Sequence, residues 1–133
     1  MTEGNDRLTL GRTMRIVRQG DFARARAGRC TASDGRLVVY ALPNGRDHPR
    51  VGLAVSRRHG KAVQRNRLRR LLREAFRLEQ HNLPAGFDYL LVPRPSKNID
   101  LLACRRSLLR LGREAVQRWQ QRPDRRAQAT DPR

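Results

Sequence analysis

Acidic residues are scarce in this chain of 133 residues, in which 30 Lys and Arg stand against only 12 Asp and Glu. The acids are scattered and form no dense carboxylate cluster of the kind that a protein-borne two-metal nuclease needs. The three histidines have neither HExxH nor Cys/His zinc spacing, and a GxSxG motif and a phosphate-binding glycine loop are missing too. From these residues the chain is predicted to bind a ligand rather than to catalyse a reaction by itself.

Long hydrophobic runs are missing as well. The longest run, from Leu37 to Leu42, has the length of a strand and falls far short of the roughly 20 residues of a membrane helix. The first ten residues contain no basic segment followed by an apolar one, so no export signal is predicted. Cys30 and Cys104 belong to no CxxC pair, and we expect reduced, buried thiols rather than a disulfide. A cytoplasmic protein without membrane contact is therefore expected.

The net charge of +18 and the sequence pI of about 11.8 indicate what kind of partner the chain binds rather than how it folds. A polyanion is expected to bind, nucleic acid before an anionic membrane. Of the 30 basic residues only Lys61 and Lys97 are lysines. The planar guanidinium of arginine can bind a phosphate through two hydrogen bonds and can stack on a base. A GC-rich genome explains the same bias equally well.

The charge is densest between Val51 and Arg77, where nine basic residues accompany one acid, Glu74. An apolar set in this stretch recurs at i, i+3, i+4, i+7 and i+8, which predicts an amphipathic helix to about Gln80. The basic residues lie on the arc of the helix opposite this apolar face. A face that is merely solvated would be expected to mix positive and negative charges, so we favour nucleic-acid contact for the basic arc. Asn66 on that arc is either a tolerated surface residue or a hydrogen-bonding group between phosphate clamps. The apolar set is Leu68, Leu71, Leu72, Ala75 and Phe76.

Four strands are predicted at residues 29–32, 36–42, 51–55 and 87–92, the first two joined by a tight turn at Asp34 and Gly35. Helices are predicted after Asp21, over the basic stretch, and from the N-cap Asp100 to Trp119. The order αβββαβα describes an α+β sandwich with a four-stranded sheet. One face of the second strand is expected to pack on a helix and the other to form a floor open to a ligand. We expect one domain over residues 13–120, a flexible segment at 1–12 and a disordered basic tail at 121–133.

The segment Gln64 to Arg70, within GKAVQRNRLRRLLREAF, resembles the RNR motif of the protein subunit of bacterial ribonuclease P. An Arg-Asn-Arg triplet alone is weak, but the resemblance extends to RVGLAVSRR before it, to Gly20-Asp21-Phe22, to the strand with Tyr40, to FDYLLVPRP and to the last helix. It covers roughly residues 7 to 118.

The resemblance implies that a catalytic RNA subunit with bound Mg²⁺ performs the cleavage and that the protein is a non-catalytic subunit of an endoribonuclease. The protein would bind that RNA and hold the 5′ leader of precursor tRNA in a cleft, promoting removal of the leader. No cofactor or metal of its own and no obligate protein partner are expected. The strands at Val51 and Tyr89 would be parallel and joined by a left-handed crossover, against the usual right-handed rule.

The resemblance also assigns residues to two surfaces. The helix face that contacts the catalytic RNA would consist of Lys61, Arg65, Asn66, Arg67, Arg69, Arg70 and Arg73. The leader cleft would be lined by Phe22, Arg26, Tyr40, Arg57 and Arg58, where bases can stack on rings.

Two positions depart from the pattern: Arg26 stands where relatives often have a second aromatic, and His59 where an apolar residue is common. The alternative from another class is a structural RNA-binding protein of the ribosome, and a self-sufficient protein nuclease is disfavoured by the scattered acids.

Overall fold

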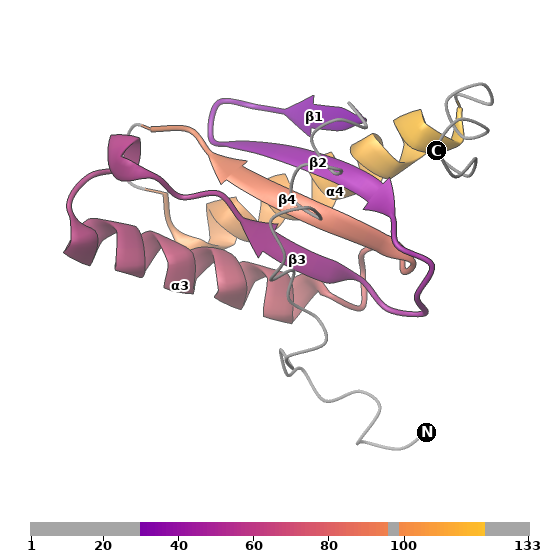
Figure 1. The fold of residues 1–133 in the computed structure, drawn as a ribbon, viewed down its shortest axis with the longest axis horizontal. Helices are drawn as coiled ribbons and strands as arrows, with labels where there is room; N and C mark the ends of the chain where they lie inside the picture. The colour runs from indigo at the N-terminus through magenta and orange to yellow at the C-terminus, as the bar shows by residue number, and fades with distance from the viewer. Residues whose placement is uncertain (1–29, 96–98, 122–133) are drawn as a thin grey trace, which may run out of the picture.

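The computed structural model describes residues 30–95 and 99–121, which form one four-stranded sheet with two long helices against one of its faces (Figure 1). The strand order is β1-β2-β4-β3. The helix predicted after Asp21 and both predicted terminal segments lie outside these residues, apart from residue 121. The elements are β1 (Thr31–Ser33), β2 (Leu37–Pro43), β3 (Arg50–Leu53), the 3-10 turn η2 (Arg57–His59), α3 (Ala62–Glu79), β4 (Phe87–Pro93) and α4 (Leu101–Gln120).

The sheet is mixed, which confirms the predicted α+β class. Strand β2 pairs antiparallel with β1 and with β4. Strand β3 runs parallel to β4, with Val51 opposite Tyr89, so the parallel pairing implied by the resemblance is confirmed. The hand of the crossover through α3 stays a prediction.

The hairpin between β1 and β2 differs in detail from the expectation. The first strand begins at Thr31 rather than at residue 29. A side chain shapes the turn: Asp34 Oδ1 accepts the backbone N–H groups of Arg36 at 2.8 Å and Leu37 at 2.9 Å. Gly35 is not among the glycines with positive φ, so the turn depends on the carboxylate of Asp34 rather than on a left-handed glycine.

The core lies between the inner face of the sheet and the two helices. Leu37, Val39 and Ala41 alternate along β2 and are fully buried. The ring of Phe76 on α3 packs 6.4 Å from that of Tyr89 on β4, so α3 lies on the same face as α4. The pattern predicted for β2, with one face packed on a helix, is confirmed.

Both cysteines belong to this core. Cys30 and Cys104 are free, buried thiols, as predicted. Burial, followed by the negative charges of Asp100 and Asp34, raises the pKa of Cys104 to about 11. The thiol therefore behaves as a small apolar side chain at neutral pH.

Gly60 fixes the start of α3. Its φ of 109° lies in a region that side-chain-bearing residues rarely adopt. Gln64 Oε1 then accepts the backbone N–H of Lys61 at 2.8 Å, which closes the first turn of the helix. The predicted apolar face is confirmed: Leu72, Ala75 and Phe76 are buried, and Leu68 and Leu71 are half-buried.

Candidate nucleic-acid interface

The predicted RNA-binding side chains of α3 spread over a wide arc of the helix. Arg65, Arg69 and Arg73 form a row at i, i+4 and i+8. This row borders the exit of β3, because Arg69 Nη2 donates to the carbonyl of Val55 at 3.4 Å. At roughly 100° per residue, Arg67 lies about 160° around the helix from Arg69. The basic side chains of α3 therefore do not all point in one direction.

Asn66 has a definite partner on this helix. Its Oδ1 accepts a hydrogen bond from Arg69 Nη1 at 3.1 Å, and Arg69 also reaches Val55. The amide therefore holds a neighbouring guanidinium in place, although Asn66 as a whole is exposed. A contact of Asn66 with phosphate stays a prediction.

The positive charge of η2 and α3 is not balanced within the part of the chain that the structure describes. Each of the seven acids there has a partner other than these side chains of η2 and the first three turns of α3: Asp34 with Arg110, Asp47 with His48, Glu74 with Arg77, Glu79 with Arg105, Asp88 with Arg50, Glu114 with Arg118, and Asp100 as the N-cap of α4. No described carboxylate is ion-paired with the basic face, by which we mean Arg57, Arg58, Lys61, Arg65, Arg67, Arg69, Arg70 and Arg73.

The helix dipole adds to this imbalance. The first turn of α3 contains no acid, although carboxylates are the residues that a helix N-terminus favours. Lys61 occupies the N-cap and Arg65 follows one turn later. Cations at the positive end of a helix cost stability in the free protein, and an anion bound there removes that cost.

Arg77, the last of the nine basic residues in the charged stretch, is ion-paired within α3. Its guanidinium forms a two-bond ion pair with Glu74, at 2.9 and 2.6 Å. The hydrogen bonds with Glu74 raise the pKa of Arg77 and lower the pKa of Glu74. The basic face therefore ends at Arg73.

Helix α4 differs from α3 in how its arginines are used. Arg105 donates to Glu79 at 2.8 Å, Arg110 to Asp34 at 2.7 Å, and Arg118 to Glu114 at 2.9 Å. The first two ion pairs fasten α4 to α3 and to the hairpin, and the third lies within α4 itself.

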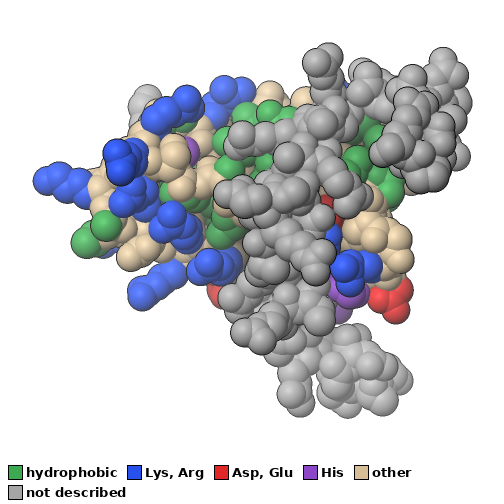
Figure 2. Space-filling view, viewed as in Figure 1, with side chains coloured by type: hydrophobic (Ala, Val, Ile, Leu, Met, Phe, Trp, Pro, Cys, Tyr) green, Lys and Arg blue, Asp and Glu red, His purple; other side chains and the backbone are tan. Residues whose placement is uncertain are grey.

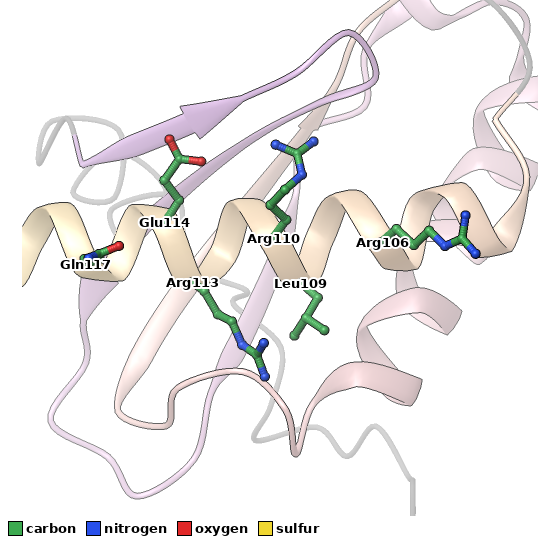
Figure 3. A pocket seen from close by; sticks show the side chains of 6 residues that line it. All are labelled: Arg106, Leu109, Arg110, Arg113, Glu114 and Gln117. Carbon is green, nitrogen blue, oxygen red and sulfur yellow. The ribbon is translucent and has the colours of Figure 1, made fainter.

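A shallow hollow follows α4, but its side chains do not converge. Figure 3 shows Arg110 and Glu114 pointing to one side of the helix and Arg113 to the other. Arg113 donates to the carbonyl of Asn82, at 3.2 Å for its shorter bond. The hollow is lined by Arg106, Leu109, Arg110, Arg113, Glu114 and Gln117. This arrangement does not make a ligand site.

The outer face of the sheet holds the described part of the predicted leader cleft. Tyr40 lies half-buried on β2, opposite Leu90 of β4, and Arg57 and Arg58 are exposed on η2. Figure 2 shows Lys and Arg side chains over α3 and the η2 end, beside a strip of hydrophobic side chains over the sheet. Phe22 and Arg26 lie outside the described residues, so their place in a cleft stays a prediction.

A buried ion pair on β3 and β4 was not predicted. Arg50 Nε and Nη2 donate to the two carboxylate oxygens of Asp88 at 2.7 and 2.5 Å, and Asn44 Nδ2 donates to Asp88 at 2.9 Å. The side chains of Arg50 and Asp88 are only 11% and 5% exposed. Arg50 is therefore a structural residue rather than part of the basic face. The parallel register places Arg50 opposite Asp88, and no local pattern in the sequence signals that pairing.

Asp34 is a second unpredicted structural residue. Its Oδ2 accepts from Ser107 Oγ and Arg110 Nη2, both at 2.7 Å, so it joins the hairpin to α4. Burial acts to raise the pKa of Asp34, but the hydrogen bonds from Arg36, Ser107 and Leu37, with the charge of Arg110, outweigh burial and lower that pKa.

Among the described residues, no three His, Cys, Asp or Glu side chains lie together as a metal site. In the same part of the chain, neither long helix is apolar enough to cross a membrane.

The fold and this surface define a basic α+β protein whose arginine-rich helix lacks acidic partners in the described part of the chain. A comparison with models of protein families matches residues 10–121 to the family described as Ribonuclease P. The chain is 40% identical over 99 residues to the ribonuclease P protein component of Methylococcus capsulatus, covering 73% of this chain and 77% of the relative.

Solved structures agree. The ribonuclease P protein of Thermotoga maritima is 33% identical, with a TM-score of 0.68 over 74% of this chain and 94% of that one. The Staphylococcus aureus protein is 30% identical, with a TM-score of 0.65 over 74% and 91%. The chain belongs to the ribonuclease P protein family.

Proposed function

We propose that this protein binds the catalytic RNA subunit of ribonuclease P and the 5′ leader of precursor tRNA, and so promotes endonucleolytic removal of the leader. The observation that carries the proposal is the basic face, whose eight cationic side chains have no acidic partner among the described residues. Such a face is unfavourable in the free protein, because like charges at i and i+4 repel. Phosphates of a bound RNA would neutralise it.

The chemistry of cleavage belongs, in this proposal, to the RNA. Mg²⁺ held by the RNA partner would supply the activated water and stabilise the leaving oxygen. The protein side chains would bind and position: arginine forks on α3 would engage phosphates, and Tyr40 on the outer face would offer a ring for base stacking. The cytoplasm is the proposed place of this reaction.

The basic face is tested by removing one exposed arginine. Arg70→Ala, or Arg67→Ala, is expected to weaken association with the catalytic RNA by about 1–3 kcal/mol, the range for a charge-assisted contact. The measurement is reconstitution of precursor cleavage at low protein concentration and low Mg²⁺.

Arg106→Ala is the matched control, because Arg106 is also exposed but lies on α4. It is expected to change association little. Equal losses for Arg70→Ala and Arg106→Ala would mean that only overall charge matters, and unchanged reconstitution by Arg70→Ala would refute the assignment of α3.

The leader contact is tested separately. Phe22→Ala, with Tyr40→Ala as the matched change on the described strand, should reduce affinity for leader-bearing precursor and leave affinity for mature tRNA unchanged. Equal losses for both RNAs would contradict the leader assignment without affecting that of α3.

A further inference from the structure

The turn η2 carries two arginines at the junction between the sheet and α3. Arg57 and Arg58 are both exposed, and the turn occupies the few residues between the end of β3 and the start of α3. Two backbone bonds close it on itself: His59 N–H to Ser56 O at 2.9 Å and Gly60 N–H to Arg57 O at 3.1 Å. Neither bond fixes the turn relative to the sheet.

The imidazole of His59 makes that connection. Its Nε2 lies 2.6 Å from the carbonyl oxygen of Pro93, the last residue of β4. Its Nδ1 lies 3.0 Å from the backbone nitrogen of Ser56. Since a carbonyl only accepts, Nε2 carries a proton in its bond to Pro93. Nδ1 also lies 3.2 Å from the carbonyl oxygen of Ser56, so both of its contacts are with Ser56. The His59 ring thus connects Ser56, the residue just before the turn, to Pro93 at the end of β4.

The other side chain bonded near this turn acts on a different segment. Arg69 donates to the carbonyl of Val55, before the turn begins. Within residues 30–95 and 99–121, the side chains of Arg57 and Arg58 make no hydrogen bond to the sheet. His59 is therefore the residue of the turn whose side chain attaches it to a strand.

We propose that His59 is a positioning residue that holds Arg57 and Arg58 in the orientation in which they meet leader phosphates. This inference rests on the proposed function and adds to it a role for a side chain that does not itself touch RNA. A turn fixed before binding loses less conformational freedom when the complex forms, so the same two arginines bind more tightly.

Two conservative substitutions separate the halves of the ring. In His59→Gln, the amide nitrogen reaches the place of Nε2 and can still donate to Pro93. In His59→Asn, the shorter side chain can accept from Ser56, as Nδ1 does, but cannot reach Pro93. The pair therefore tests the connection to β4 while both variants keep a polar group at this position.

The assay is binding of fluorescently labelled leader-bearing precursor tRNA, and of mature tRNA, to the full chain assembled with the catalytic RNA. His59→Asn is expected to weaken precursor binding roughly three- to tenfold, the range for ordering a loop or a few side chains on binding. His59→Gln should bind within about twofold of the unaltered protein, and neither change should alter mature tRNA binding.

A thermodynamic cycle with Arg57→Ala/Arg58→Ala distinguishes positioning from a general loss of structure. In that background the His59→Asn change should have no further effect on precursor affinity, because the arginines that it positions are gone. Hydrogen exchange at the amides of residues 57–60 should be faster in His59→Asn than in His59→Gln.

The outcomes that overturn the inference are specific. Wild-type precursor affinity in His59→Asn, equal weakening by Asn and Gln, or an undiminished effect in the arginine-free background would each do so. If Arg57→Ala/Arg58→Ala itself leaves precursor binding unchanged, the proposed leader contact of the turn fails instead.

Discussion

Replacing Arg65 by Gln is expected to move two measurements in opposite directions. Arg65 has like charges at i−4 and i+4, Lys61 and Arg69, lies near the positive end of α3, and has a buried Nε without a hydrogen-bond partner among residues 30–95 and 99–121. Two repulsive pairs of roughly 0.2–0.5 kcal/mol each and a dipole contribution of roughly 0.3–1 kcal/mol would be removed. Gln has nearly the same helix propensity as Arg.

After allowance for lost packing of the aliphatic stem, the free protein should be more stable by about 1 kcal/mol, which raises Tm by about 4 °C or more for a domain of this size. Affinity for the catalytic RNA should fall by about 1–3 kcal/mol. The slope of log affinity against log salt should fall by roughly 0.7–0.9 for one lost phosphate contact.

Arg118→Gln is the matched control, since it is the same substitution on α4. Arg118 donates to Glu114 and to the carbonyl of Thr31, so its loss should lower stability by up to about 1 kcal/mol. RNA affinity and the salt slope should stay unchanged. An Arg65→Gln protein that is less stable and binds RNA normally would refute the reasoning, because it would show that Arg65 serves the fold.

Three further results are expected. Asp88→Asn should destabilise the fold by about 3–5 kcal/mol in denaturant unfolding, because it breaks the buried ion pair between Asp88 and Arg50; Arg50→Met/Asp88→Leu should recover much of the loss, and a double variant as unstable as the sum of both single changes would contradict this. Because the pKa of Asp34 is lowered in the folded state, this carboxylate contributes its full stabilisation above pH 3.8, its ordinary pKa, and loses it as pH falls through the lower folded-state pKa. Asp34→Asn should therefore make the free energy of unfolding less dependent on pH in that window, and an unaltered pH profile would rule out the effect. The pKa of Cys104, raised to about 11, predicts that a thiol reagent at pH 8 modifies it only at the rate of unfolding; fast modification of the folded protein would contradict the placement.

The periodic elements could be predicted from the sequence, because burial imposes a period on the residues that form them. The spacing from Leu68 to Phe76 gave the buried side of α3 directly, and Asp100 marked the start of α4, where its Oδ1 accepts the N–H of Ala103 at 2.7 Å. The alternation in β2 separated its two faces, although it did not show which of them packs on the helices. These are local patterns, and each is readable within one element.

The ion pairs could not be read in the same way, because they join residues that are far apart in the chain. Arg50 and Asp88 meet only because β3 and β4 are parallel and in that register. Asp34 looked like an ordinary turn residue, and its bonds to Ser107 and Arg110 depend on how α4 crosses the hairpin. Composition alone could not show which arginines are ion-paired with an acid. Arg110 is paired with Asp34, whereas the arginines of the basic face have no acidic partner among the described residues.

The uneven distribution of acids also affects how quickly the protein meets its partner. With the described carboxylates paired away from η2 and the first three turns of α3, the described part of the chain has an electric dipole whose positive end is that basic face. In the field of a polyanion this dipole turns the protein before contact, so that more encounters begin in a productive orientation and association is faster than for an evenly charged protein. Added salt shortens the reach of that field, and the rate of capture then falls before the bound complex itself is lost.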